Sequence, residues 1–399
     1  MLNVKELKTG ADKYGTPLYV FDIDELMDTV SYLKQGLGNR ADICFAMKAN
    51  PFLTRQMTEL TDRIEVCSMG EYEICEGLGI APERLLISGV LKEKEDILKI
   101  LTRCRGACAY TIESPNQFYC LAEWSEENRE VLHVYLRLTS GNQFGMDEKM
   151  IRYLMQVSRK YSFLKIKGLH YFSGTQKKSV KKIKRELFYL DDVCRRLGDI
   201  EELEYGPGIP AAYFQNQNNE QDTYITAIAE TIAEMKWKGK ITLEMGRALT
   251  ASCGCYLTRI KDIKQNDGKN YCIVDGGIHQ LQYDGQIRGM YHPKIQVLKE
   301  TKTGCTSNEE KEWTVCGSLC TVNDILVQNM RAGELEVENV LVFETAGAYS
   351  AMEGMALFLS HELPAITTFR HTTGWKLIRE KKPTYHWNME RMTNDGNFN

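Results

Sequence analysis

The sequence lacks the features that mark membrane, exported and nucleic-acid-binding proteins. Its longest apolar runs have the length of a strand, far short of the ~20 residues that span a bilayer, so we expect no membrane-spanning helix. The N-terminal residues MLNVKELK lack the apolar core of a signal peptide, and we therefore expect a cytoplasmic protein. With 50 basic and 54 acidic residues the net charge is −4, which argues against a nucleic-acid partner.

The 13 cysteines are numerous and odd in number, yet they lack the spacing of a metal site. The sequence contains no C-x-x-C, and no histidine stands at zinc-finger spacing from the close cysteine pairs, so we expect no metal. Because an export signal is missing, we expect free thiols that pack as small apolar side chains. The close pairs are Cys104/Cys108, Cys253/Cys255 and Cys316/Cys320.

What is present is an ordinary globular composition, with 43% apolar and 26% charged residues. The 399 residues suggest two or three domains, or one large barrel with a smaller domain. Eight strand-like segments recur in the first two thirds, separated by helix-like segments, and this alternation implies parallel pairing. Eight such units are typical of a (β/α)8 TIM barrel, with a doubly wound open sheet as the alternative. The strand-like segments are 43–49, 64–68, 85–89, 107–112, 131–138, 166–172, 203–208 and 241–246, and examples of the helix-like ones are 71–79, 93–104, 149–161, 180–197 and 221–237.

After Arg247 the pattern changes to strand-like runs without long helices, which predicts a second, mainly β domain. The strand-like segment 16–22 precedes the first barrel unit, and we assign it to the β domain. The predicted domains are therefore a barrel over 23–250 and a β domain made of 1–22 plus 251–399. The later strand-like segments are 255–260, 271–274, 295–297, 313–316, 340–343 and 366–370.

In a barrel of this type the chemistry lies where strands end. Lys48 stands at the end of the first strand among apolar residues. Burial of an amine is costly and favours its neutral form, which suits Schiff-base chemistry. The alternative is a lysine that extends from the barrel mouth into solvent.

A phosphate site is indicated at the ends of the last two strands. Gly206 and Gly208 can present backbone N–H groups, and Gly246 with Arg247 adds a bare backbone and a guanidinium. Glu244 beside this site would repel a phosphate unless a positively charged ring lay between them, and a pyridinium nitrogen meets that need. Lysine, phosphate cradle and acid together point to pyridoxal 5′-phosphate.

The chain resembles the fold-type III pyridoxal-phosphate decarboxylases, the diaminopimelate and ornithine decarboxylase family. The resemblance runs from about residue 14 to about residue 370 through short motifs in the family's order. These motifs are YGTPLYVFD at 14–22, FAMKAN at 45–50, EVCS at 65–68, LEMGR at 243–247, GSLC at 317–320 followed by Asp324, and AGAY at 346–349.

The resemblance implies an amino-acid carboxy-lyase that uses pyridoxal phosphate and forms a homodimer with active sites at the interface. It implies that Lys48 holds the cofactor, that Glu244 pairs with the ring nitrogen, and that Cys320 returns the proton from the partner subunit. Glu65 and Arg137 would orient these groups. The residues implied around the phosphate are Thr175, Gly206, Gly208, Gly246, Arg247 and Tyr349.

Several positions depart from the usual family pattern. Phe172 stands where a histidine usually stacks on the cofactor ring, and His170 lies two residues earlier. Thr321 follows Cys320 where enzymes acting on diamino substrates usually carry an acid for the distal ammonium. Tyr283 lies where diaminopimelate enzymes tend to have an arginine, a charge that Arg288 could supply instead. We include Asp324 with these substrate-pocket candidates.

These departures resemble one branch of the family, found in butirosin biosynthesis, which decarboxylates glutamate tethered to an acyl carrier protein. The resembling segments are 143–148, 319–324 and 358–361. We expect α-decarboxylation of an amino acid or of an aminoacyl conjugate on a carrier protein. Diaminopimelate decarboxylation is the alternative. A racemase is less favoured because of Glu244 and the Cys320 motif, and a non-catalytic regulator because Lys48, Glu244, Arg247 and Cys320 are all present.

Six basic residues crowd the segment 177–185, KKSVKKIKR. A run of charge is usually a solvated helix face. The alternative is a docking surface for an acidic carrier protein.

Overall fold

The computed structural model describes residues 2–299 and 310–390. Contacts divide the chain into two compact units. One unit, the barrel unit, comprises Met27–Ala211 and Glu220–Leu249. The other, the β unit, comprises Met1–Leu26, Ala212–Asn219 and Thr250–Asn399. The segment Ala212–Asn219 thus groups with the β unit although barrel segments flank it in sequence.

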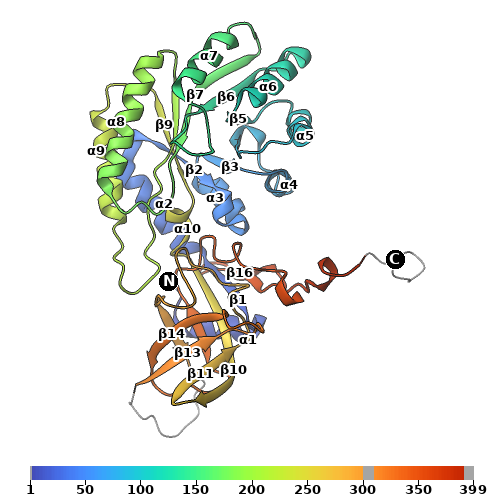
Figure 1. Cartoon of the computed structure of the whole chain (residues 1–399), viewed down its shortest axis with the longest axis vertical. Coiled ribbons are helices and arrows are strands. Elements are labelled where there is room, and N and C mark those ends of the chain that lie inside the picture. The colour runs from blue at the N-terminus through green and yellow to red at the C-terminus, as the bar shows by residue number, and fades with distance from the viewer. Residues whose placement is uncertain (1, 300–309, 391–399) are drawn as a thin grey trace, which may run out of the picture. The chain divides into compact units, whose positions relative to one another are not determined.

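Eight parallel strands close into a barrel in the order of the chain, from β2 round to β9, which next pairs with β2 (Figure 1). The expectation of a (β/α)8 barrel is confirmed. The strand bounds are β2 Asp42–Ala46, β3 Arg63–Val66, β4 Leu85–Ile87, β5 Ala109–Ile112, β6 Leu132–Arg137, β7 Leu164–Phe172, β8 Glu202–Gly206 and β9 Lys240–Met245.

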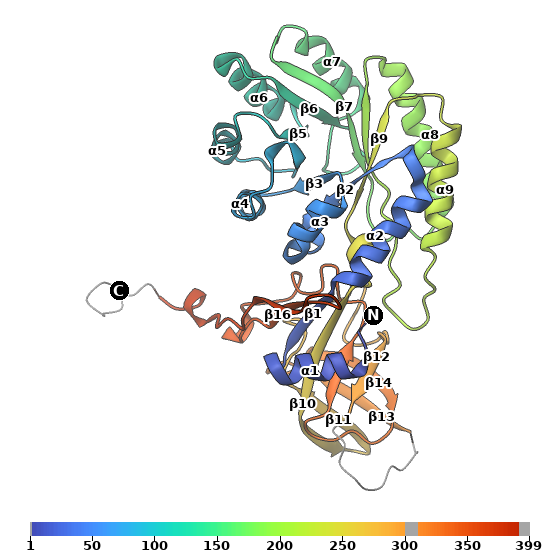
Figure 2. The ribbon, with the colours of Figure 1, turned by 180° about the vertical axis from the view of Figure 1, so that it is seen from behind.

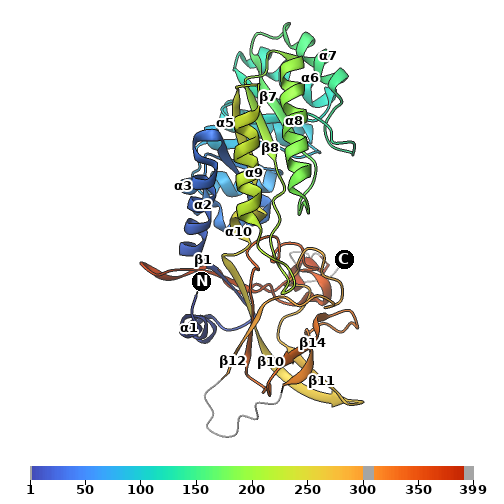
Figure 3. The ribbon, with the colours of Figure 1, turned by 90° about the vertical axis from the view of Figure 1, so that its left-hand side faces the viewer.

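Helices follow these strands, and several begin at side-chain caps. Ser68, Ser114 and Asp147 each accept a hydrogen bond from the backbone N–H three residues on, which fixes where α4, α6 and α7 start. The helix bounds are α2 Ile23–Leu37, α3 Thr54–Leu60, α4 Met69–Gly77, α5 Lys94–Cys104, α6 Pro115–Asn128, α7 Glu148–Ser158, α8 Val180–Leu197, α9 Gln221–Glu234 and α10 Arg247–Thr250. Short 3-10 turns span Gly38–Arg40, Met47–Ala49, Pro51–Leu53 and Pro82–Arg84. Figure 3 shows α8 and α9 side by side on the outside of the barrel.

The strands are buried on both faces, as a barrel covered by helices requires. Inside the barrel, below the strand ends that carry the site, a charged pair is enclosed. Arg63 donates to the Glu204 carboxylate at 2.9 Å and to the Tyr135 hydroxyl at 3.0 Å. Burial raises the pKa of Glu204 to about 7, against the lowering effect of the Arg63 charge. Glu204 is fully buried in this pair, whereas Arg63, at the start of β3, stays partly exposed.

The β unit is a nine-stranded mixed sheet with the helix α1 (Val4–Tyr14), which begins at a capping box formed by Asn3 and Glu6 (Figure 2). Its N-terminal strand β1 pairs in parallel with β16 and antiparallel with β10, so the assignment of this strand to the β domain is confirmed. The strands are β1 Leu18–Asp22, β10 Gly254–Asn266, β11 Lys269–Val274, β12 Ile295–Leu298, β13 Lys311–Cys316, β14 Ile325–Ala332, β15 Val340–Phe343, β16 Ala365–Arg370 and β17 Gly374–Arg379. Two 3-10 turns span Phe358–Ser360 and Tyr385–Trp387.

Within residues 2–299 and 310–390, every helix is too short or too polar to span a bilayer.

Candidate active site

Three predicted site residues meet at the carboxyl ends of adjacent barrel strands. Lys48 lies in the turn that follows β2, and β2 pairs with both β3 and β9, which carry Glu65 and Glu244. The Lys48 ammonium donates to Glu65 at 2.5 Å and lies 3.6 Å from the Glu244 carboxylate. Strand order therefore places one amine between two carboxylates, although the three residues are far apart in sequence.

Glu244 is buried, yet its neighbours favour the charged form. Burial alone would raise the pKa of Glu244, but Lys48, a hydrogen bond with His170 and the charge of Arg137 outweigh it and lower the pKa to about 2. The His170 ring nitrogen Nε2 lies 2.8 Å from the Glu244 carboxylate, and His170 is itself buried. The carboxylate is thus held ionised and in a fixed orientation.

Arg137, which ends β6, is paired on one side and stacked on another. Its guanidinium donates to Glu113 at 2.7 Å and lies over the Phe144 ring at 4.5 Å. The other oxygen of Glu113 accepts the backbone N–H of Gly145 at 3.3 Å. This buried pair fixes the loop that follows β6 against the barrel mouth. Glu113 was not predicted from the sequence, because only the barrel brings it to Arg137.

Lys92 is a second residue that the sequence analysis missed. It follows β4, and its ammonium donates to the Gly89 carbonyl at 2.7 Å and the Thr111 hydroxyl at 3.2 Å. Desolvation lowers the pKa of Lys92 to about 8, although Glu113 counteracts it. In the sequence, Lys92 stands directly before a run of charged residues that are exposed. Nothing in that pattern predicts that its amine turns inward.

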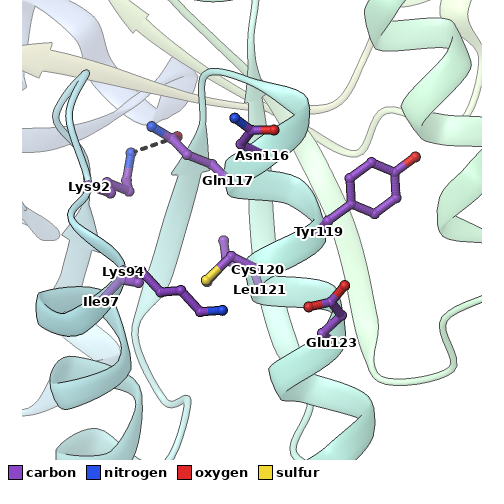
Figure 4. Close-up of a pocket in the computed structure, with 9 residues that line it drawn as sticks. All are labelled: Lys92, Lys94, Ile97, Asn116, Gln117, Tyr119, Cys120, Leu121 and Glu123. Atoms are coloured by element: carbon purple, nitrogen blue, oxygen red, sulfur yellow. Dashed lines mark hydrogen bonds between the residues drawn. The ribbon is translucent and has the colours of Figure 1, made fainter.

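Beyond Lys92, a pocket of about 330 Å³ lies between α5 and α6 (Figure 4). Figure 4 shows Lys92 hydrogen bonded to Gln117, with Lys94, Tyr119 and Glu123 among the other residues that line the pocket. None of the predicted site residues lines this pocket. Among the lining residues, Lys92 has a pKa that the charges of Glu113 and Glu65 raise and that of Arg137 lowers.

At the glycines predicted at the last strand ends, an added side chain would collide with neighbouring atoms. At Gly208, whose φ is +64°, an added Cβ would lie 2.1 Å from the Gly174 carbonyl oxygen. At Gly206 it would lie 2.4 Å from the Phe172 ring, and at Gly246 2.7 Å from Ala49. Three glycine backbones thus gather at the ends of β8 and β9. Phe172 packs against Gly206 with its ring partly exposed.

The arginine and hydroxyl predicted beside these glycines meet each other. Arg247 is buried and its Nε lies 3.3 Å from the Thr175 hydroxyl oxygen. Thr175 is exposed, and two residues later the backbone N–H of Lys177 donates to the Gly208 carbonyl at 3.0 Å. The loop after β7 is therefore tied to the loop after β8, and its hydroxyl lies beside a guanidinium.

Together these residues fit pyridoxal phosphate. A lysine amine lies beside a buried, ionised carboxylate, which is the partner that a protonated ring nitrogen requires. The glycine backbones, the Thr175 hydroxyl and the Arg247 guanidinium are the donors that a phosphate takes, and they stand after the last barrel strands where barrels commonly bind phosphate.

The remaining predicted residues lie in the β unit. Cys320 is exposed, and the following Thr321 is partly exposed, with its hydroxyl accepting the backbone N–H of Asn323 at 3.4 Å. Tyr349 has a φ of +64° and is half-buried, and the Arg288 side chain is exposed.

Two of the predicted substrate residues already have partners within the β unit. Both oxygens of the buried Asp324 carboxylate accept backbone N–H groups, from Ile278 at 2.8 Å and from Leu319 at 2.7 Å. The buried Tyr283 donates its hydroxyl to the Glu344 carbonyl at 2.6 Å. Asp324 therefore holds the loop that carries Cys320.

The comparison with known families shows to which family the chain belongs. The family model described as pyridoxal-dependent decarboxylase, C-terminal sheet domain, matches residues 18–347. The chain belongs to this family. The family prediction made from the motifs is confirmed, and the decarboxylase is a carboxy-lyase as expected.

Individual relatives of this decarboxylase are distant but cover almost its whole length. The L-glutamyl-[BtrI acyl-carrier protein] decarboxylase of Niallia circulans is 24% identical, over 95% of this chain and 94% of that protein. The diaminopimelate decarboxylase of Aquifex aeolicus is also 24% identical, over 86% of this chain and 84% of that protein.

Solved structures support the fold. The crystal structure of diaminopimelate decarboxylase from M. jannaschii superposes with a TM-score of 0.84 at 22% identity, covering 97% of this chain and 94% of that one. The lysine/ornithine decarboxylase of Vibrio vulnificus superposes with a TM-score of 0.78 at 18% identity, covering 92% of this chain and 97% of that one.

Proposed function

We propose that this decarboxylase removes the α-carboxylate of a glutamyl group carried as a thioester on an acyl carrier protein, with pyridoxal phosphate bound through Lys48. The α-carboxylate must be free to leave, so the thioester must be on the side-chain carboxylate. The Niallia circulans relative, which is named for a glutamyl carrier-protein substrate, supports this choice.

The roles at the barrel mouth are proposed from its geometry. When bound, pyridoxal phosphate supplies a sink for the electrons that the departing carboxylate leaves behind. Lys48 would hold the cofactor, and Glu244, held in place by His170, would keep the ring nitrogen protonated. Glu65 would orient the Lys48 amine, and Arg137 would add positive charge near Glu244. Phe172 would offer a flat face in place of the usual histidine.

The phosphate would be held by the bare backbones of Gly206, Gly208 and Gly246. Arg247 and Thr175 would add a charged donor and a hydroxyl, since they already lie 3.3 Å apart. We propose Tyr349 as a further phosphate-binding residue.

The observation that carries the substrate proposal is the chemistry of the segment 317–324. Its sequence, GSLCTVND, holds one carboxylate, Asp324, and both oxygens of that carboxylate accept backbone N–H groups. Thr321 cannot supply the charge-assisted contact that a distal ammonium requires. A neutral thioester needs no such partner, so this segment suits a tethered substrate better than a diamino acid.

We propose that the enzyme acts as a homodimer in which Cys320 of one copy serves the barrel of the other. The exposed thiol and the 80% exposed Val322 beside it support a partner surface there. More large apolar side chains are exposed further along the same unit. They are Met352, Met355, Leu357, Phe358, Leu359, Tyr385 and Trp387.

Diaminopimelate decarboxylation is the second candidate. Relatives with that activity match this chain at the same 24% identity as the carrier-protein enzyme. The exposed Arg288 is the charged side chain that could bind a distal carboxylate.

Carbon dioxide release by the purified protein with added pyridoxal phosphate separates these candidates. The substrates are diaminopimelate, ornithine, lysine, arginine, free glutamate, glutamyl pantetheine thioester and the same thioester on a carrier protein. We expect release from the thioesters and not from diaminopimelate. Release from diaminopimelate alone contradicts the proposal. Lys48→Ala is the control, and its full activity would contradict the enzyme assignment itself.

A further inference from the structure

The helix α8 carries an unusual arrangement of charge at its first turns. Lys178 lies just before the helix, and Lys181, Lys182 and Arg185 follow within it at spacings that place these three on one face. All four side chains are exposed, and among the described residues no carboxylate lies within ion-pairing distance of them. We call these four residues the α8 basic patch.

The other two cations of this run are engaged elsewhere. Lys177 is buried and pairs with Glu186 at 2.6 Å, and Lys184 pairs with Glu230 at 3.3 Å. Glu186 also accepts hydrogen bonds from Ser173 and Tyr205. These contacts fix the start of α8 to the ends of β7 and β8, so the α8 basic patch is presented from a rigid base.

The α8 basic patch opposes the stability of its own helix. The N-terminus of a helix carries partial positive charge, so cations there are unfavourable and acids favourable. The helices α1, α2, α4, α5, α7 and α9 follow this rule with an acidic residue in the first turn, whereas α3, α6 and α8 have none. In α8 the first turn holds no acid, and the Ser179 side chain makes no capping hydrogen bond. Neighbouring cations at three- and four-residue spacings also repel one another.

The patch continues into exposed aromatic side chains on the same face. Phe188 is 43% exposed and Tyr189 44% exposed, one and two turns after Arg185 and Lys182. Exposed aromatic rings beside unpaired cations are typical of protein-binding surfaces rather than of a merely solvated face.

The position of the patch relates it to the site. The loop 173–179 leads from β7 into α8, and it holds Thr175 beside Arg247 and Lys177 against Gly208. The patch therefore begins three residues after Thr175, at the carboxyl end of the barrel strands.

We propose that the α8 basic patch, with Phe188 and Tyr189, docks an acidic acyl carrier protein that delivers the tethered substrate. The inference rests on the proposed function, because the enzyme needs a docking site for a carrier protein only if its substrate is bound to one. Opposite charges would speed encounter and set orientation, and the aromatic rings would supply the apolar contact.

The test uses the full-length enzyme with pyridoxal phosphate and two probes: glutamyl pantetheine thioester, and L-glutamyl-loaded BtrI carrier protein. The triple variant Lys181→Glu, Lys182→Glu, Arg185→Glu should lower kcat/KM for the carrier probe by about tenfold or more and flatten its dependence on salt. The short thioester should be turned over within about twofold of wild type, because it makes no contact with the patch.

The control is a matched charge reversal at Lys160, Lys165 and Lys236, which are exposed near the amino ends of the barrel strands. This control should leave both probes unchanged. Because acids favour a helix N-terminus, the α8 triple variant should also melt at a higher temperature than wild type, which separates lost docking from lost folding.

The outcomes distinguish the two proposals. The docking site is contradicted if the wild-type enzyme has the same kcat/KM for the carrier probe as for the short thioester. It is also contradicted if the triple variant and the control variant have equal kcat/KM for the carrier probe. Either result leaves the proposed function standing. Failure of the wild-type enzyme on both thioesters overturns the proposed function, and the docking site with it.

Discussion

Glu244 is the residue on which the chemistry at the barrel mouth should depend most. Its pKa of about 2 means that it stays a carboxylate throughout the physiological range. We predict that Glu244→Gln lowers kcat by about 100-fold or more, because a neutral amide cannot keep a ring nitrogen protonated. Steady-state kinetics with saturating pyridoxal phosphate measures this, and an unchanged kcat would remove Glu244 from the mechanism.

Glu204→Gln is the matched control, since it neutralises another buried glutamate inside the same barrel. Glu204 pairs with Arg63 below the strand ends that carry the site. We expect this change to lower the free energy of unfolding while kcat stays within a few-fold of wild type, because Arg63 loses its carboxylate partner at 2.9 Å and keeps only Glu202 at 3.9 Å.

Lys92 should make the free energy of unfolding depend on pH between about pH 8 and pH 10. Its pKa is about 8 in the folded protein, below the ordinary value for lysine of about 10.4. Between these values the unfolded chain binds more protons, so the contribution of Lys92 to the free energy of unfolding rises with pH.

We predict that the difference in unfolding free energy between wild type and Lys92→Met shifts in favour of wild type by about 1–2 kcal/mol from pH 8 to pH 10, after allowance for solvent screening. Urea titrations at both pH values measure it. Lys94→Met, at an exposed lysine two residues on, is the control and should show no such shift. A constant difference for Lys92→Met would mean that its amine titrates normally.

At the scale of elements, the loop after β8 depends on one glycine. Gly208 has a φ of +64°, and a Cβ there would lie 2.1 Å from the Gly174 carbonyl. We predict that Gly208→Ala separates the loops after β7 and β8 and lowers the affinity for pyridoxal phosphate by about tenfold or more. Backbone strain at this position should also lower the free energy of unfolding by ~1–3 kcal/mol. Fluorescence titration with the cofactor measures this.

Gly79→Ala provides the comparison for that loop. Gly79 has a similar φ of +69°, but a Cβ there would meet nothing within 4 Å. This variant should lose stability through backbone strain alone and keep wild-type cofactor affinity. Equal affinity in both variants would show that the loop after β8 does not hold the cofactor.

The sequence predicts the bounds of a helix or strand correctly where a local residue pattern determines them. The helix α8 and the strand β15 have the bounds expected, 180–197 and 340–343, because each has a strong periodic or β-branched pattern. The strand β14 was not expected. Its sequence ILVQNMRA mixes apolar and polar residues, and Asn329 has a φ of +51° within it, so pairing with β13 rather than local preference makes it a strand.

The same division applies to the site. Lys48, Glu65 and Glu244 could be predicted to meet because each lies at a strand end, and barrel closure then brings the first and last strands together. Glu113 and Lys92 could not be predicted, because their importance comes from contacts with Arg137 and Thr111 that only the folded barrel creates.

At the scale of the whole molecule, the proposed homodimer makes a prediction about mixtures. Lys48→Ala removes a residue of the barrel unit and Cys320→Ala removes one of the β unit, so each variant alone should be nearly inactive. If Cys320 serves the barrel of the partner, a mixed dimer contains one intact site. Unfolding and refolding the two variants together in equal amounts should then restore roughly a quarter of wild-type decarboxylation.

The control is a mixture of Lys48→Ala with Glu244→Gln. Both residues lie in the same barrel unit, 3.6 Å apart, so every site in a mixed dimer lacks one of them. This mixture should recover no activity, whereas the first should. If neither mixture recovers activity although native mass spectrometry of differently tagged copies shows mixed dimers, Cys320 acts within its own chain, and the exposed apolar surface beside it must have a role other than completing the site.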